Sequence, residues 1–244
     1  SESDLRKVRW NDISIVFQGA MNAWNPVIKI GEQIREAIRE HHPENTKKEN
    51  TEKISELFKI VGLDDSIMDR FPHELSGGMK QRAVIALALS CDPKIVIADE
   101  PTTALDVVIQ DQILKEIKKV QELLGLSLIY ISHDIAVIAE MTNRMAVMYA
   151  GRIVETGPTS EIFSNPRHSY TKSLLGSTPS VVGDRVKLNS LDGEPPSLIN
   201  EETGCSFSPR CSNPTENCKT GKSEMGLIEV APGHLADKCC VECV

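Results

Sequence analysis

Four consecutive apolar residues, Ile95-Val96-Ile97-Ala98, constrain the fold of this chain more than any other feature. An apolar run without alternation is typical of a strand that is buried on both faces, as in a parallel sheet. Leu126 to Ile131 is a second such run, and Ile13 to Phe17 is a shorter one. Helical patterns separate the three runs. This alternation predicts an α/β fold with a mainly parallel sheet.

The segment between the first two strands predicts a helical insertion over about residues 27–92. Apolar residues recur there at helical spacing in three stretches, 30–38, 54–61 and 79–89. The polar stretch from His41 to Glu52 predicts an exposed connection within this insertion. Further along the chain, the same spacing predicts helices over 109–124 and 135–141, and residues 145–155 predict a hairpin around Ala150-Gly151.

The composition of the sequence changes after Gly157. From about residue 178 the chain is rich in Pro, Gly, Ser and Cys, and six of its seven cysteines lie at or after Cys205. Such clustering indicates a local cysteine site and not a disulfide framework that spans the chain. We therefore predict a domain over 1–157 and a small Cys-rich extension over 158–244.

Bulk properties exclude several classes of protein. The net charge of −8 argues against a nucleic-acid surface. The longest apolar run near the middle, Ala83 to Leu89, is too short to cross a bilayer. No signal peptide is recognisable, and the chain begins with Ser1. These features predict a soluble intracellular protein whose sequence is cut at its start.

Polar side chains follow each predicted strand: Gln18 the first, Asp99-Glu100 the second and His133 the third. Ligands of α/β sheets bind at the carboxyl ends of the strands. One carboxylate pair alone would be weak evidence, since surface carboxylates are common. Functional groups at three strand ends are stronger evidence for a site. Ser76-Gly77-Gly78 precedes a predicted helix, where Ser76 can be the N-cap and the free backbone amides can bind an anion.

These residues resemble the motifs of ATP-binding cassette (ABC) ATPases, in the family's order and at similar spacing over about residues 5–175. The resemblance implies a P-loop NTPase core that binds ATP and Mg²⁺. The matching motifs are the Q-loop at Gln18, the signature Leu75-Ser76-Gly77-Gly78-Met79-Lys80-Gln81-Arg82, the Walker B strand Ile95 to Glu100, the D-loop Ala104-Leu105-Asp106 and the switch histidine His133.

The resemblance implies a role for each strand-end residue. Asp99 would hold Mg²⁺, largely through water, because oxygen ligands suit that cation. Glu100 would be the general base that orients or deprotonates the attacking water; the alternative is a second carboxylate beside the metal. His133 would contact the γ-phosphate. Gln18 would contact Mg²⁺ or water and transmit nucleotide occupancy to a membrane partner.

The signature residues would act across a dimer. Ser76, Gly77 and Gly78 would bind the γ-phosphate of ATP held mainly by the opposite subunit, and Asp106 would cross the interface. The next three residues, Lys80 to Arg82, are expected on the surface or in packing contacts.

The family's phosphate loop, G-x-x-x-x-G-K-[ST], does not occur in this sequence. Gly221-Lys222 follows Cys218 and lacks the glycine five residues earlier. The chain thus resembles an ABC ATPase without its N-terminal portion. We predict that this chain alone does not hydrolyse ATP at a useful rate. Robust turnover that Glu100→Gln leaves unchanged would contradict this prediction and the assignment.

Two regions are similar to the oligopeptide/dipeptide and nickel importer branch of the family. One is the Q-loop segment Phe17 to Pro26, where Gly19-Ala20 replaces a common Asp-Pro. The other is the tail over about 158–240, with Ile162 to Thr171 and Gly204 to Cys211 as its most distinctive parts. The resemblance implies an ATPase subunit on the cytoplasmic side of the membrane, with a second ATPase, two permeases and an external peptide-binding protein as partners.

The tail places four cysteines at spacings that could hold a [4Fe–4S] cluster or a tetrahedral zinc: Cys205, Cys211, Cys218 and Cys239. The spacings alone favour no metal, because none is a tight C-x-x-C pair. The resemblance implies a structural [4Fe–4S] cluster, with free or disulfide-bonded thiols as the alternative. Cys240 and Cys243 could replace Cys239, whereas His168, His234 and Arg210 are expected to be turn and surface residues.

The sequence therefore predicts the ATP-hydrolysing subunit of an importer for dipeptides or oligopeptides. Two alternatives stay open, a non-transport ABC ATPase that acts on nucleic acid or ribosomes and a non-catalytic remnant. The acidic charge and the importer-like tail argue against the first, and the intact Glu100 and His133 against the second. The transported solute is set by the permeases and the binding protein, so this chain does not reveal it.

Overall fold

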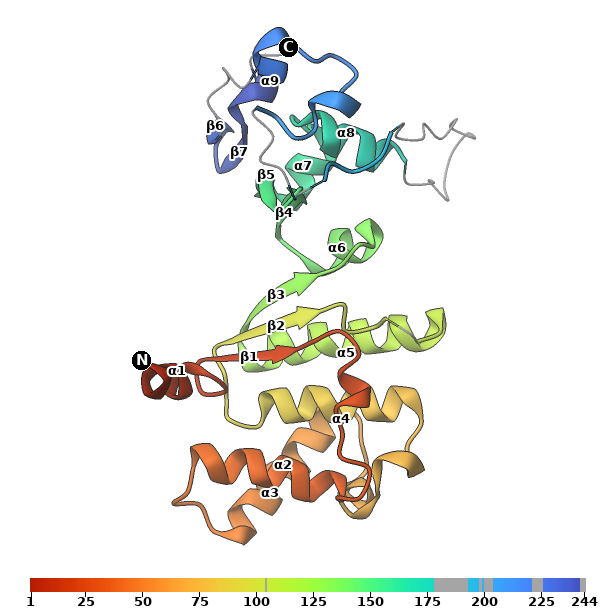
Figure 1. Cartoon of the computed structure of the whole chain (residues 1–244). Helices are drawn as coiled ribbons and strands as arrows, with labels where there is room; N and C mark the ends of the chain where they lie inside the picture. The colour runs from red at the N-terminus through yellow and green to blue at the C-terminus, as the bar shows by residue number, and fades with distance from the viewer. Residues whose placement is uncertain (104, 178–192, 198, 200–203, 221–225, 242–244) are drawn as a thin grey trace. The chain divides into compact units, whose positions relative to one another are not determined.

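A computed structural model describes residues 1–103, 105–177, 193–197, 199, 204–220 and 226–241 (Figure 1). The chain forms two compact units, Ser1–His133 and Asp134–Val244, and each is described by itself. Ala104 of the predicted D-loop, the Gly221-Lys222 pair and Cys243 lie outside the described residues. In the described part of the chain, no helix combines the length and the hydrophobicity needed to cross a bilayer.

The first unit contains the predicted parallel sheet. After α1 (Glu2–Val8) come the strands β1 (Ile13–Val16), β2 (Ile95–Asp99) and β3 (Ser127–Ile131). They are parallel and lie in the order β1-β2-β3, with Ile97 aligned between Ile15 and Ile129. All three carboxyl ends therefore lie at one edge, as the sequence predicts.

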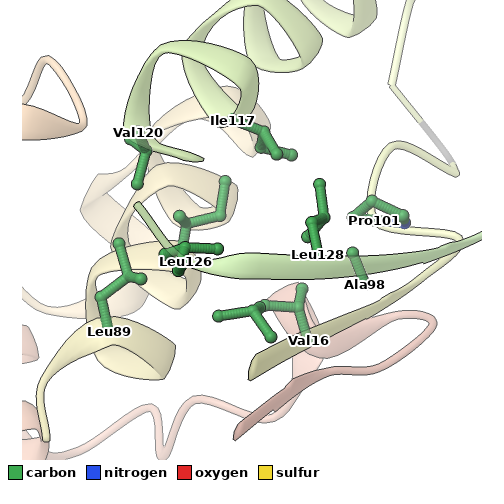
Figure 2. Close-up of a pocket in the computed structure, with 10 residues that line it drawn as sticks. Val16, Leu89, Ala98, Pro101, Ile117, Val120, Leu126 and Leu128 are labelled. Atoms are coloured by element: carbon green, nitrogen blue, oxygen red, sulfur yellow. The ribbon is translucent and has the colours of Figure 1, made fainter. Parts of the chain in front are cut away.

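Two helices, α4 (Gly77–Leu89) and α5 (Val107–Leu124), pack against one face of this sheet. Figure 2 shows apolar side chains from the sheet and both helices around a small cavity. Its volume of about 20 Å³ leaves room for one water at most, and its lining is apolar. This cavity is a packing defect of the core and cannot hold a nucleotide. The lining residues are Val16, Ile85, Leu89, Val96, Ala98, Pro101, Ile117, Val120, Leu126 and Leu128.

The opposite face of the sheet is apolar but exposed. Ile13, Ile15, Phe17, Ile129 and Ile131 are between 36% and 50% exposed. The apolar runs predict strands covered on both faces, whereas the described part of the first unit covers only one. The alternation of buried and exposed residues along β1 follows from this one-sided packing.

A helical segment lies between β1 and β2, as predicted. It comprises a 3₁₀ turn at Ala20–Asn22, α2 (Ile30–His41), α3 (Lys47–Ile60) and 3₁₀ turns at Asp65–Asp69 and Pro72–Glu74. The predicted exposed connection over 41–52 is too long: it is confirmed for residues 42–46 and wrong beyond them, because α3 begins at Lys47. Thr46 caps this helix: its Oγ1 accepts from Glu49 N at 3.3 Å, and its own N–H donates to Glu49 Oε2 at 2.7 Å.

The second unit contains an antiparallel sheet of order β4-β5-β7-β6. The hairpin of β4 (Arg144–Tyr149) and β5 (Arg152–Pro158) confirms the prediction for 145–155. The tail adds β6 (Leu227–Ala231) and β7 (His234–Asp237), which the sequence pattern missed because both strands are short and mixed in polarity. The helices are α6 (Ile135–Met141), α7 (Thr159–Ser164), α8 (Ser169–Gly176), α9 (Glu216–Thr220) and α10 (Lys238–Val241), with a 3₁₀ turn at Ser208–Arg210.

Candidate functional site

Glu100 is the centre of a polar cluster at the carboxyl edge of the parallel sheet. Gln18 Nε2, which follows β1, donates to Glu100 Oε2 at 2.8 Å. His133 Nδ1, which follows β3, lies 2.9 Å from Glu100 Oε1. Thr103 Oγ1 donates to Oε2 at 2.9 Å. The structure thus joins Gln18, Glu100 and His133, which are predicted from three separate strands.

The backbone of Glu100 adopts an unusual conformation. Its φ of +46° lies in the left-handed region, which costs a non-glycine residue about 1–3 kcal/mol. Two hydrogen bonds hold it there: Glu100 N donates to Ile131 O at 2.9 Å, and Thr103 N donates to Glu100 O at 3.2 Å. Strain of this kind is concentrated at functional sites. The sharp turn after β2 brings the carboxylate between Gln18 and His133.

The surroundings of Glu100 keep its carboxyl group ionised. The hydrogen bond with His133, and then that from Thr103, lowers the pKa of Glu100 below its ordinary value of 4.5. The Glu100 side chain is 22% exposed and that of His133 is 79% exposed. The carboxylate is therefore in its basic form at neutral pH and open to solvent on the side of His133.

We expect His133→Ala to raise the pKa of Glu100 towards 4.5, because the hydrogen bond that lowers it most is lost. In the wild type, ionisation of Glu100 persists to a lower pH, and the stabilisation it gives is lost only as the pH falls through the folded-state pKa. A ¹³C NMR titration of the glutamate carboxyl carbons measures this difference. His73→Ala is the control and should leave Glu100 unchanged. An unaltered Glu100 titration in His133→Ala would contradict the geometry.

The same edge offers ligands suited to a hard divalent cation. Asp99 ends β2, one residue before Glu100, and Gln18 brings an amide oxygen to the same edge. Carboxylate and amide oxygens are the ligands that Mg²⁺ takes in proteins, and it commonly keeps several waters. The donor set therefore fits Mg²⁺ and does not fit a thiophilic metal.

The signature residues open α4. Ser76 is its N-cap, and Ser76 Oγ accepts from Met79 N at 3.3 Å. A Cβ on Gly77 would lie 3.4 Å from Leu105 Cδ2, and one on Gly78 would lie 3.0 Å from Ile109 Cγ2. Gly78 therefore allows the close approach of α4 to the start of α5, whereas a Cβ on Gly77 would be at about ordinary contact distance. Two of the three residues that follow, Gln81 and Arg82, are packing residues as predicted: Gln81 is buried, and Arg82 Nη2 lies 2.8 Å from Glu116 Oε1.

Asp106 lies beside the signature residues, as the N-cap of α5. Its Oδ1 accepts from Ile109 N at 3.0 Å, so this carboxylate stabilises its own helix. Leu105 and Ile109, which lie close to Asp106 in sequence, face Gly77 and Gly78. Glu100 belongs to a separate group with Gln18, Thr103 and His133. The structure therefore presents two sets of functional residues in the first unit and does not join them through a hydrogen bond among the described residues.

Thr103 is a functional candidate that sequence reasoning missed. It belongs to the turn Pro101-Thr102-Thr103, which the sequence pattern marks only as a connection. Its hydroxyl and its backbone N–H both bond to Glu100. The three-residue offset from a strand-end carboxylate is the signal that could have found it, because it is the offset of a tight turn.

The cysteines of the tail gather in the core of the second unit. Cys205, Cys218, Cys239 and Cys240 are at most 7% exposed, and Cys211 packs against them. Cys205 N donates to Cys218 O at 3.1 Å, and the sulfurs of Cys239 and Cys240 lie 3.9 Å apart. All the cysteines that the structure describes are free thiols. The four predicted cysteines thus line or pack against one small core. The ligand atoms that the described residues bring within 4.8 Å of one another there are those of His168, Cys239 and Cys240, and not those of the four predicted cysteines.

Two histidines of this unit are not the turn and surface residues that the sequence predicts. His168 and His234 are both fully buried. His168 interacts with the thiols of Cys205 and Cys240, and His234 Nε2 lies 2.8 Å from Glu155 Oε1. Arg210 is also engaged, since its Nη1 donates to Tyr149 Oη at 3.3 Å. A sequence does not reveal the burial of a single histidine, so these contacts required the fold.

Comparisons with known proteins agree with the geometry. Residues 3–103 match the family described as ABC transporter, and residues 154–218 match the oligopeptide/dipeptide transporter C-terminal region. A putative peptide import ATP-binding protein of Brucella ovis is 48% identical over 247 aligned residues, which cover 98% of this chain and 72% of the relative. The chain belongs to the ABC transporter ATP-binding family.

Other relatives of this ABC protein carry related names. An oligopeptide transport ATP-binding protein of Bacillus subtilis is 43% identical, and the match covers 92% of this chain and 69% of the relative. A dipeptide transport ATP-binding protein of Haemophilus influenzae is 46% identical, with 89% of this chain and 66% of the relative covered. These relatives fall in the branch that the tail resembles.

Solved structures of ABC cassettes resemble the fold. One is the dimer of an ATP-binding cassette in a post-hydrolysis state bound to ADP and Pi. It superposes with a TM-score of 0.57 and 29% identity, over 65% of this chain and 68% of that chain. The likeness confirms the P-loop NTPase type of α/β fold for this ABC protein.

Proposed function

We propose that this ABC protein is the ATP-hydrolysing subunit of an importer for dipeptides or oligopeptides. It would bind peripherally to two permease subunits on the cytoplasmic side of the membrane, and an external binding protein would deliver the peptide. The ionised Glu100 carboxylate, held between Gln18 and His133, supports hydrolysis. The family and the names of the relatives support peptide import.

In the proposed reaction Glu100 acts on water. Its carboxylate accepts a proton from a water that attacks the γ-phosphorus; a new P–O bond forms, and the bond to the bridging oxygen of ADP breaks. His133 fixes one oxygen of Glu100, while Gln18 and Thr103 donate to the other. His133, whose ring lies beside this carboxylate, would also contact the phosphoryl group during attack. Asp99 and Gln18 would hold Mg²⁺, which neutralises charge on the phosphates.

The two groups of site residues imply that two ATPase subunits cooperate. Ser76, Gly77 and Gly78 would offer the free amides of α4 to ATP that the other subunit holds, and Asp106 would lie at the same interface. A helix N-terminus that begins with two glycines has no side chains at these positions to keep a phosphate away from its amides. The dimeric cassette among the solved relatives supports this arrangement.

Two further assignments complete the proposal. The ATPase domain would extend to residue 157, with the extension over 158–244, and the match of residues 154–218 to the importer C-terminal region supports that division. The extension would hold a [4Fe–4S] centre on Cys205, Cys211, Cys218 and Cys239, because a small apolar core of free thiols gains stability from a metal. A protein purified without oxygen that contains neither iron nor sulfide would contradict this centre.

Affinity purification from membranes tests the transport assignment. We expect the full-length protein to retain two permease subunits and a second ATPase in detergent. A tagged Glu122→Gln variant is a suitable control, since this surface change on α5 leaves the site untouched. Recovery with ribosomes or DNA in place of permeases would favour a non-transport ABC ATPase and contradict the proposal.

A further inference from the structure

His168 is held by α8 in a way that fixes its tautomer. It is the N-cap of this helix, and its Nδ1 accepts from Tyr170 N at 3.0 Å. A nitrogen that accepts a hydrogen bond carries no proton. The neutral imidazole has one N–H, so the proton of His168 must lie on Nε2.

The Nε2 of His168 is a buried donor that faces sulfur. It has no conventional hydrogen-bond partner among the described residues, and the side chain is fully buried. His168 interacts with the thiols of Cys205 and Cys240. A ring nitrogen of His168 and the sulfurs of Cys239 and Cys240 all lie within 4.8 Å of one another. A buried donor left without an acceptor is costly. This arrangement therefore points to a sulfur as the acceptor, in a hydrogen bond that forms when the sulfurs bind a metal.

A buried carboxylate fixes the position of the ring. Glu155, on β5, is fully buried, and its Oε2 accepts from His168 N at 2.9 Å. Its Oε1 accepts from Arg167 N at 2.7 Å and lies 2.8 Å from His234 Nε2. The backbone that carries His168 is thus anchored to the β5–β7 sheet, and the imidazole has little freedom to turn away from the thiols.

We propose that His168 is a positioning residue that donates its Nε2–H to thiolate ligands of a metal centre that includes Cys205 and Cys240. This inference rests on the metal centre proposed above and takes Cys240, which the sequence offers as a replacement for Cys239, as one of its ligands. His168 is not a metal ligand. A metal on Nε2 would require the ring proton on Nδ1, which is the atom that accepts from Tyr170 N.

The hydrogen bond has two measurable consequences. An N–H that points at a thiolate disperses its charge, which strengthens retention of the metal; loss of such an outer contact typically weakens metal affinity 10–100-fold. Hydrogen bonds to the sulfurs of an iron–sulfur cluster also set its reduction potential. Loss of the Nε2–H donor should therefore weaken retention of the metal and make the reduction potential of an iron–sulfur cluster more negative.

Two substitutions separate the cap from the donor. His168→Asn places an amide oxygen where Nδ1 lies and so keeps the cap of α8, but it removes the distal N–H. His168→Gln can place an amide N–H near the position of Nε2. His73→Asn, at an exposed histidine of the first unit, is the matched control. Circular dichroism and thermal unfolding of each metal-free protein check that it folds.

The full chain is loaded without oxygen with Fe²⁺ and sulfide, and iron, sulfide, loss to a chelator and reduction potential are measured. We expect His168→Asn to lose iron about 10-fold faster than the wild type and to have a more negative potential. His168→Gln and His73→Asn should match the wild type. Two results would overturn the proposal: wild-type behaviour of His168→Asn, or complete loss of the centre from both His168 variants, which would make His168 a ligand.

A measurement on the wild type needs no variant. In protein loaded with Zn²⁺, which is diamagnetic, ¹H–¹⁵N NMR of labelled histidine reports which nitrogen of His168 carries the proton. We expect a proton on Nε2, and a proton on Nδ1 with metal-bound Nε2 would contradict the inference. A wild type that binds neither iron nor zinc would overturn the metal centre itself, a result distinct from a loaded wild type in which His168→Asn has no effect.

Discussion

Replacement of Glu100 by Gln is expected to lower ATP turnover of the assembled transporter at least about 100-fold, because an amide cannot accept the proton of the attacking water. ATP binding should be retained, since Gln keeps the shape of the side chain and a carbonyl oxygen that Thr103 can still donate to. Phosphate release and nucleotide binding are measured side by side on the purified complex.

The control for this prediction is Glu122→Gln, which makes the same chemical change on the exposed surface of α5. It should leave turnover within about twofold of the wild type, because surface substitutions of this kind have small effects. Equal turnover in Glu100→Gln and in the control would show that Glu100 is a second carboxylate beside the metal and not the general base.

Replacement of Glu155 by Ala is expected to destabilise the second unit by at least about 3 kcal/mol. The change leaves three donors without an acceptor, Arg167 N, His168 N and His234 Nε2. A buried polar group that loses its partner costs about 1–3 kcal/mol. The loss affects β5, β7 and the start of α8 together.

Hydrogen exchange followed by mass spectrometry measures this effect unit by unit. Both tryptophans, Trp10 and Trp24, lie in the first unit, so their fluorescence would not report on the second. Amides of β5 and α8 should exchange much faster in Glu155→Ala, with the first unit unchanged. Glu229→Ala is the control: among the described residues this exposed glutamate accepts from Gly233 N alone, and its loss should cost less than about 1 kcal/mol. Equal protection of β5 in both variants would contradict the role of Glu155.

The spacing of apolar residues along the sequence predicts those helices and strands whose apolar residues all face one core. The stretch that becomes α4 reads as a helix because its buried residues recur at helical spacing, and Ser76 marks its start. The spacing of apolar residues does not predict the start of α3, because its first turn is charged and exposed, and only the capping pair Thr46 and Glu49 reveals it. Strands β6 and β7 escape prediction because β7 is stabilised by pairing with β5, which is distant in sequence, and β6 pairs with β7 alone among the described strands.

The functional residues divide in the same way, into those that the sequence predicts and those whose surroundings depend on distant parts of the chain. The cluster of Gln18, Glu100 and His133 is predictable, since parallel strands bring their carboxyl ends to one edge. The surroundings of the cysteines are not. His168 follows Asn165-Pro166, which reads as a turn, and no local pattern reports that Glu155 draws this turn into the core. Burial that depends on a partner in another strand is visible only in the fold.

The measurement that tests the central claim most directly is ATP-driven uptake of a labelled dipeptide or oligopeptide. Proteoliposomes would contain the permeases, the external binding protein and the full-length ATPase pair. We predict that the wild type accumulates peptide and that Glu100→Gln, assembled to the same extent, accumulates none. Accumulation that Glu100→Gln leaves unchanged, or ATP hydrolysis by the wild type without any peptide uptake, would contradict the account.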